Sequence, residues 1–162
     1  MPRPRRQGRR RPWVTVGLAA VAIALVVWTI HSRRQPGTWQ RVFATREGMI
    51  GGMTSSRTII AADSMFVALP DRRALGRDVE VRYHDRGIVV PVLDVGPWNV
   101  ADPYWEHDAR PASERGRGVY RTPVNPAGID LSNATFAALG LHDNDYVEWR
   151  FVHRGYVVPP WL

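Results

Sequence analysis

The chain of 162 residues contains neither cysteine nor lysine. Without cysteine, disulfide bonds and thiolate metal sites are excluded, so a folded domain has to be held together by its buried core. All 22 basic side chains are arginines, which we attribute to the coding bias of a GC-rich genome rather than to chemistry. The sequence also lacks a glycine-rich phosphate loop and internal repeats.

Acidic residues are missing from the first part of the chain. Residues 1–34 hold eight arginines and no acid, whereas residues 35–162 hold fourteen arginines and fifteen acids, a net charge of −1. The formal charge of +7 therefore comes from the N-terminal arm. Binding to nucleic acid requires a clustered basic face on the folded part, so no nucleic-acid partner is expected.

An uncharged stretch follows the basic arm. Residues 13–30 carry no charge, and as a helix they would be roughly 27 Å long, close to the thickness of a bilayer core. Trp13 and Trp28 stand near its ends, where interfacial aromatic residues are common. We expect a single-pass anchor in the inner membrane, with the arm 1–12 in the cytoplasm and the C-terminal domain in the periplasm or otherwise outside the cytoplasm.

The alternative for this stretch is a cleaved signal peptide. Its apolar run is longer than the usual h-region, and no A-x-A-like cleavage site follows, which favours an uncleaved anchor. The mixed composition of residues 31–47 predicts a linker, residues 48–155 a folded domain and residues 156–162 a tail.

From Gly48 onward the pattern is one of short strands. The alternating and continuous apolar runs predict strands at Thr58–Ala62, Phe66–Leu69, Val79–Tyr83, Ile88–Val95 and Tyr146–Val152. One short helix is expected between Asp130 and Gly140, with Asp130 or Ser132 as its N-cap. Residues 99–123 show no period and predict a long loop, a kind of segment that often carries function.

The segment from Val92 to Asn99 is the most informative part of the sequence. It reads as an apolar strand that ends in Asp94, followed at once by a Gly-Pro turn. A carboxylate at a strand end is held rigidly and could act as a general acid toward a ligand. The alternative is that Asp94 only accepts backbone hydrogen bonds in the turn, as aspartates in turns often do.

The order of several motifs resembles the double-psi β-barrel domain of the rare lipoprotein A family. The resemblance covers about a hundred residues, from about residue 52 to residue 152. It is carried by Thr54-Ser55-Ser56, Leu69-Pro70 with Gly76, Asp94-Val95-Gly96-Pro97-Trp98, Ile129-Asp130-Leu131-Ser132 and Leu139-Gly140.

This resemblance implies a mostly-β fold, a six-stranded double-psi β-barrel with one or two short helices. Related barrels in expansins, family-45 endoglucanases and membrane-bound lytic transglycosylases act on β-linked glycans with an aspartate in the groove. That aspartate falls on Asp94 here, and the implied partner is cell-wall glycan. Two features depart from the family: Phe66 stands where a histidine is usual, and the loop after Asp94 is longer.

Glycan cleavage requires a carboxylic acid that donates a proton to the leaving oxygen. Hydrolysis also needs a second carboxylate about 5–9.5 Å away, whereas a lytic transglycosylase can use one group as acid and then as base. A single candidate, Asp94, fits the second chemistry better. The sequence leaves open whether Asp102, Glu106, Asp108 or Asp130 assists, and Asp130 is more simply explained as a helix cap.

Candidate substrate-binding residues lie close to Asp94 in the sequence. Trp98, Tyr104 and Trp105 could stack on sugar rings, or they could fill gaps in the core. Asn99 could bind a sugar hydroxyl or close the turn, and Thr54 belongs to the family-like segment. The acidic residues and His107 of the long loop lack metal-ligand spacing, so neither a metal nor another cofactor is expected.

Two functions therefore remain open. The first is a membrane-anchored envelope protein that binds and cleaves peptidoglycan-type glycan with Asp94 as acid/base. The second is a non-catalytic module that holds glycan or an envelope protein partner, which the phenylalanine at position 66 favours.

Overall fold

The computed structural model describes residues 37–116, 118–119, 124–155 and 158. The predicted arm 1–12, the anchor 13–30 and most of the tail 156–162 lie outside the described residues. Within the described residues, no helix has the length and apolar character needed to cross a membrane.

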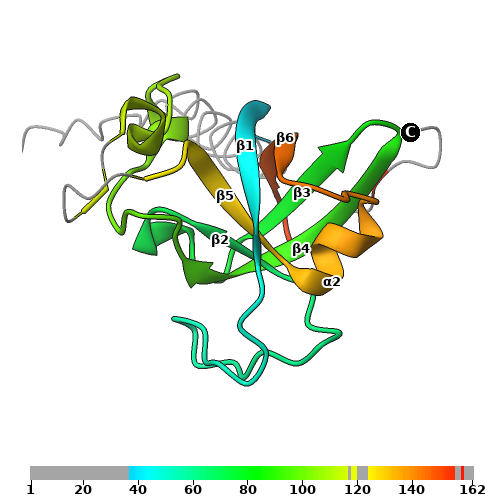
Figure 1. Cartoon of the computed structure of the whole chain (residues 1–162). Helices are drawn as coiled ribbons and strands as arrows, with labels where there is room; N and C mark the ends of the chain where they lie inside the picture. Colours follow the sequence, from blue (N-terminus) through cyan, green and yellow to red (C-terminus); the bar gives the residue numbers. More distant parts are fainter. Residues whose placement is uncertain (1–36, 117, 120–123, 156–157, 159–162) are drawn as a thin grey trace, which may run out of the picture. The chain divides into compact units, whose positions relative to one another are not determined.

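The described domain is mostly β, as the sequence predicted, and six strands close into a barrel in the order β1-β5-β2-β4-β3-β6 (Figure 1). Short helices lie between and after the strands. The elements along the chain are β1 (Gln40–Glu47), β2 (Val67–Leu69), η1 (Arg72–Ala74), β3 (Asp78–Tyr83), β4 (Arg86–Val95), η2 (Tyr104–Glu106), η3 (Ala112–Arg115), β5 (Ala127–Ser132), α2 (Asn133–Ala138) and β6 (Asp145–Val152).

The barrel is mixed. Strand β1 is parallel to β5 and β2 is parallel to β4, while all other neighbours are antiparallel. Four connections each pass over one neighbouring strand: β1 to β2 passes β5, β2 to β3 passes β4, β4 to β5 passes β2, and β5 to β6 passes β1. These crossings bring strand ends that are distant in the sequence to one face of the barrel.

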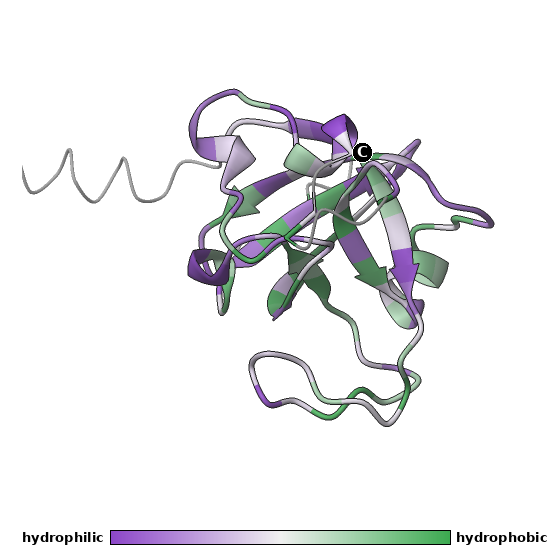
Figure 2. Ribbon diagram, turned by 60° about the vertical axis from the view of Figure 1, so that its left-hand side comes forward, coloured by the Kyte–Doolittle hydropathy of each residue, from purple (hydrophilic) through white to green (hydrophobic). Residues whose placement is uncertain are grey.

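The core fills the inside of the barrel with branched side chains from every strand. Strand residues alternate between this core and the outside, which is the period-2 pattern of a half-buried strand. In Figure 2 the hydrophobic colour accordingly runs along the strands in short patches. The fully buried strand residues include Val42, Ala44, Leu69, Val79, Val81, Val92, Ile129, Leu131 and Trp149.

Four predicted strands are confirmed with small changes of boundary, and two predictions about the remaining chain are wrong. Residues 40–47, which we expected as part of a linker, form β1, whose partners β5 and β6 supply the hydrogen bonds. The segment Thr58–Ala62 is no strand, because its pairing is limited to an isolated bridge between Met53 and Ile59.

The helix prediction is right in place but wrong in one detail. Ser132 is the N-cap of α2, since its side-chain oxygen accepts a hydrogen bond from the Thr135 amide at 3.2 Å. Asp130 belongs to β5 and caps nothing. Its side chain therefore lies on the outer side of β5.

Candidate functional site

One row of paired residues crosses four neighbouring strands. Asp94 of β4 pairs with Ala68 of β2, Ala68 pairs with Asp130 of β5, and Asp130 pairs with Thr45 of β1. Paired residues on adjacent strands point to the same side of a sheet. Because the sequence neighbours of Ala68 and Asp130 belong to the core, this row faces outward.

Glu47 lies on the same side, two residues beyond Thr45 at the end of β1. We call Glu47, Asp94 and Asp130 the carboxyl cluster. The strands that carry it are far apart in the sequence; β1 and β5 are neighbours in the barrel, and β2 separates β5 from β4 (Figure 1). Alternation along single strands could not reveal that these three carboxyl groups gather.

Small residues leave room between the acids. Ala68 stands between the two aspartates in the row, and Gly96 follows Asp94 closely. A Cβ atom at Gly96 would lie 3.5 Å from Asp130 Oδ2 and 3.9 Å from Ala68 Cβ, so the chain after Asp94 passes in contact with the second carboxylate. No large side chain at position 68 or 96 separates the two aspartates.

Asp94 is half-buried and held by the loop between β1 and β2. Its Oδ1 atom accepts hydrogen bonds from the Ser55 amide (2.8 Å), the Ser55 hydroxyl (2.6 Å) and the Val95 amide (2.8 Å). Three donors on one oxygen are the pattern of an acceptor-only carboxylate. The loop also bonds to β4 through the Ser56 amide and the Leu93 carbonyl at 3.0 Å.

Glu47 has a larger pKa shift than Asp130, the other shifted acid of the cluster. Its pKa is raised from 4.5 to about 8, first by burial and then by the charge of Asp94, a hydrogen bond to Asp94 and the charge of Asp130. Its buried Oε2 atom has no hydrogen-bond partner. Glu47 is therefore largely protonated at neutral pH and donates to Asp94.

Asp130 is shifted in the same direction but less. Its pKa is raised from 3.8 to about 6 as a net result: burial raises it, the Thr45 hydroxyl that donates to its Oδ1 lowers it, and the charge of Asp94 raises it. Carboxyl groups this close cannot all ionise at once without mutual repulsion. The cluster thus combines a proton donor, Glu47, with two proton acceptors.

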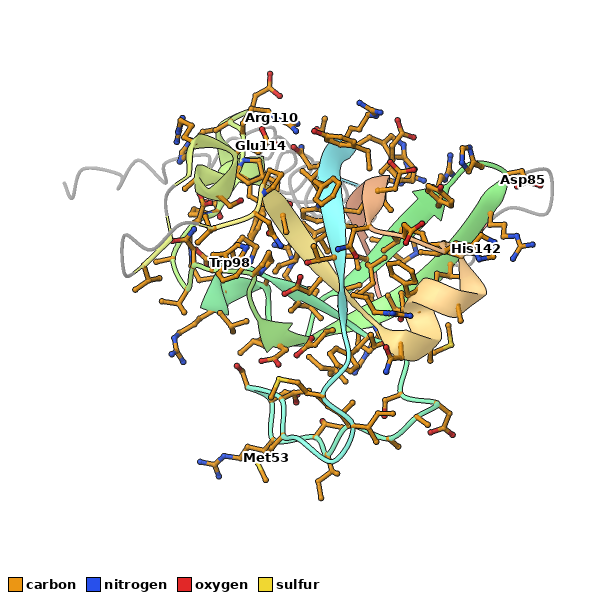
Figure 3. All side chains as sticks on the ribbon, in the orientation of Figure 1. Met53, Asp85, Trp98, Arg110, Glu114 and His142 are labelled. Atoms are coloured by element: carbon orange, nitrogen blue, oxygen red, sulfur yellow. The ribbon has the colours of Figure 1, made fainter. Side chains whose placement is uncertain are left out.

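Trp98 follows Asp94 by four residues in the sequence and is the one predicted aromatic candidate that is well exposed, at 43%. Its indole Nε1 donates to Asn125 at 2.7 Å, and its carbonyl accepts from the Val119 amide at 3.0 Å. Figure 3 shows it on the side where β2 and β4 end, away from the Asp85 turn and from His142. The ring is therefore fixed in place and open to solvent.

Tyr104 and Trp105 do not form a stacking platform, which corrects the prediction. Tyr104 is only 2% exposed. Trp105 is partly buried and packs edge-on against Tyr104, Trp149 and Phe151 at centroid distances of 5.1 to 5.5 Å. The two residues close one end of the core because η2 folds back onto the barrel.

Two further candidate residues make hydrogen bonds with the backbone around the site. Thr54 is buried, and its hydroxyl accepts from the Thr58 amide at 3.0 Å, so it shapes the loop 48–66 rather than facing a ligand. Asn99 is half-buried, and its amide donates to the Pro97 carbonyl at 2.6 Å in the turn after the site. Phe66, at the position of the family's histidine, is fully buried.

The loop 48–66 exposes several large apolar side chains. In Figure 3 the labelled Met53 lies at its outer edge, well below the strands. The loop contributes most of the exposed large hydrophobic residues of the described domain: Met49, Ile50, Met53, Ile59 and Met65. Among the residues that the structure describes, no group of three or more acids and histidines is arranged to hold a metal ion.

Fold and site together define a class: a six-stranded mixed β-barrel with an acidic site on its outer face. Residues 38–119 match the family described as "Domain of unknown function (DUF8814)", and the chain belongs to that family. The match includes Glu47 and Asp94 but ends before Asp130. Among curated proteins, none matches the chain.

Solved structures similar to this chain include the Streptomyces papain inhibitor, at 24% identity and a TM-score of 0.46, covering 73% of this chain and 97% of the inhibitor. The apo expansin of Clavibacter michiganensis is similar at 18% identity and a TM-score of 0.48, covering 75% of this chain and 54% of the expansin. A point mutant of that expansin in complex with cellohexaose is similar at 19% identity and a TM-score of 0.45, with the same coverage. This chain thus spans about half the length of the expansins, and binding of cellohexaose is a property of that protein.

Proposed function

We propose that this domain binds a glycan strand of the cell wall on the outer face of β4, β2, β5 and β1, and cleaves it with Asp94 as acid/base. The observation that carries this proposal is the position of Asp94. Its carboxylate is half-buried at a strand end and lies beside two further carboxyl groups. Carboxylates accept hydrogen bonds from sugar hydroxyls, and close carboxyl groups supply the proton transfers of glycan cleavage.

Trp98 supports a sugar ligand in particular. An aromatic face that is fixed and exposed offers apolar contact to the C–H face of a sugar ring, while the carboxyl groups bind its hydroxyls. The resemblance to the rare lipoprotein A family supports the same reading. Connections that pass over a neighbouring strand are also what a double-psi barrel requires, so we propose that topology for the barrel.

The membrane anchor at residues 13–30 completes the proposal. Its support is the uncharged run itself and the surplus of arginines before it. An anchor of this orientation would hold the barrel beside the cell wall. The orientation of the chain in the membrane is tested by fusing to its C-terminus a reporter enzyme that is active only outside the cytoplasm. We expect the reporter to be active.

Incubation of the full chain with purified peptidoglycan tests the main proposal. We expect the protein to sediment with the insoluble wall and to release products with 1,6-anhydro ends, and we expect Asp94→Asn to lose these products. A wild-type protein that neither sediments nor releases products would contradict the proposal.

The second candidate function is a binding module without catalysis, and the exposed apolar side chains of the loop 48–66 favour it. Clusters of this kind on a surface mark contact sites for other molecules. Retention on the wall without any product, unchanged by Asp94→Asn, would support this reading over cleavage.

A further inference from the structure

We propose that Glu47 is the second catalytic group of this site and gives its proton to the glycosidic oxygen, while Asp94 accepts a proton from the attacking hydroxyl. This inference rests on the proposed glycan cleavage. It assigns a chemical role to a residue at the end of β1 that faces the groups of β4 and β5.

The contacts of Glu47 support the role of donor. Its carboxyl group is hydrogen-bonded to Asp94, and two neighbouring carboxyl groups can form that bond only if one of them carries a proton. Asp94 already accepts three hydrogen bonds on Oδ1, so the proton belongs on Glu47. The Oε2 atom of Glu47 is buried and has no hydrogen-bond partner.

The charged groups that act on the carboxyl group of Glu47 are both acidic. Asp94 faces it from β4 and Asp130 from β5, and the charges that act on its carboxyl group are those of these two acids. Burial and this negative surrounding keep the pKa of Glu47 at about 8, compared with about 6 for Asp130. Of the two, Glu47 is therefore the proton donor at neutral pH.

The distance between the two carboxyl groups selects the kind of cleavage. A hydrogen-bonded pair is closer than the roughly 5–5.5 Å of retaining and the roughly 6.5–9.5 Å of inverting hydrolases. No water molecule fits between such groups for attack from the opposite side of the sugar. An attack by the C6 hydroxyl of the same sugar needs no such water.

The bonds and protons of the cleavage step balance within the pair of Glu47 and Asp94. The bond from C1 to the glycosidic oxygen breaks, and the leaving oxygen takes the electron pair and the proton of Glu47. The C6 oxygen forms the new bond to C1, and its proton passes to Asp94. The pair thus holds one proton before and after cleavage, and a proton shift along the hydrogen bond between Asp94 and Glu47 restores the starting state.

The first test compares Glu47→Gln with Asp143→Asn, an exposed acid of the loop between α2 and β6, in the full chain on purified peptidoglycan. We expect Glu47→Gln to be retained on the wall but to release 1,6-anhydro products at least about 100-fold more slowly. Asp143→Asn should match the wild type. Retention with unchanged product release in Glu47→Gln would overturn the role of Glu47 alone. Retention of the wild type without product would overturn the proposed cleavage and, with it, the role of Glu47. Loss of wild-type retention would overturn the proposed function as well.

A second test measures the proton itself, without any glycan. The side-chain carboxyl carbon of Glu47 is followed by ¹³C NMR across the pH range, in the wild type and in Asp94→Asn. We expect titration of Glu47 near pH 8 in the wild type and at a clearly lower pH in the variant, because the charge and the hydrogen bond of Asp94 contribute to the shift. Titration near 4.5 in the wild type, or an unchanged midpoint in Asp94→Asn, would overturn the shared proton.

Discussion

The indole Nε1 of Trp149 donates a hydrogen bond of 2.9 Å to the phenol oxygen of Tyr104, and both rings are buried. The Tyr104 hydroxyl in turn donates to the Gly128 carbonyl at 3.0 Å. These two hydrogen bonds connect η2 to β6 and to β5. Helix η2 belongs to the long connection that follows the site. The connection that begins with Trp98 is therefore anchored to the core and not only to its own turn.

We expect Tyr104→Phe to lower the free energy of unfolding by about 1–3 kcal/mol, because Trp149 Nε1 and the Gly128 carbonyl lose a buried partner. Urea unfolding followed by tryptophan fluorescence measures the change. The matched control is Tyr146→Phe, an exposed tyrosine on β6, which should stay within about 0.5 kcal/mol of the wild type. Equal losses in the two variants would contradict the role of the Tyr104 hydroxyl.

Glu80 of β3 is fully buried and accepts from two arginines, Arg82 at 2.8 Å and Arg150 at 2.7 Å. Both guanidinium groups also lie over the ring of Trp39, at 4.2 and 4.4 Å. We expect Glu80→Gln to cost about 3 kcal/mol, because it leaves two partly buried arginines without their counter-charge. Thermal unfolding measures this, and the exposed Glu148→Gln should leave the midpoint nearly unchanged.

The carboxyl cluster makes stability depend on pH. The pKa values of Glu47 and Asp130 are raised in the folded state, to about 8 and about 6, so the folded state binds protons that the unfolded chain has released. Their contribution to stability is complete below the ordinary values and is lost as the pH rises through about 6 and then about 8. Asp71 and Asp145, whose pKa values are lowered, act in the opposite direction only at more acidic pH.

We therefore expect a lower free energy of unfolding at about pH 8.5 than at about pH 5.5. Glu47→Gln should flatten the upper part of this dependence, since glutamine does not titrate. Chemical denaturation at a series of pH values measures both. A wild-type stability that rises across this window would show that the cluster is not buried as described.

Trp98→Ala tests the contact with sugar rings. We expect retention on insoluble cell wall to fall roughly tenfold, which corresponds to about 1.4 kcal/mol of lost contact. Fold stability should change little, since the side chain is well exposed. Val100→Ala, another exposed apolar residue of the same segment, is the control and should bind like the wild type. Equal retention of all three proteins would remove Trp98 from the binding surface.

Local patterns were sufficient to predict most of the barrel. Alternation in Val79–Tyr83 and the apolar run Ile88–Val95 predicted β3 and β4, and the Leu-Ser start and Leu-Gly end predicted α2. Strand β1 was missed because its few apolar residues, Val42 to Ala44, are consecutive and flanked by arginines, so they show no alternation. Its strand structure depends on pairing with β5 and β6, which no local pattern encodes.

Local sequence patterns predicted the site less well than they predicted the fold. By strict alternation Asp94 would share the inner face with Val90 and Val92, but the register of β4 against β2 shifts by one residue before it. This bulge turns Asp94 outward beside Ala68 and Asp130, since an extra residue changes the face of all that follow. Glu47 could not be predicted as its neighbour, because only the closed strand order brings β1 and β4 to one face.

The most direct test of the account is an amide NMR titration of the ¹⁵N-labelled chain with soluble peptidoglycan fragments. We expect the largest shift changes at Glu47, Asp94 and Asp130 and at Trp98. Changes confined to the hollow formed by Arg41, Tyr83, Asp145 and Tyr146, or no changes at saturating fragment, would contradict a glycan site at the carboxyl cluster.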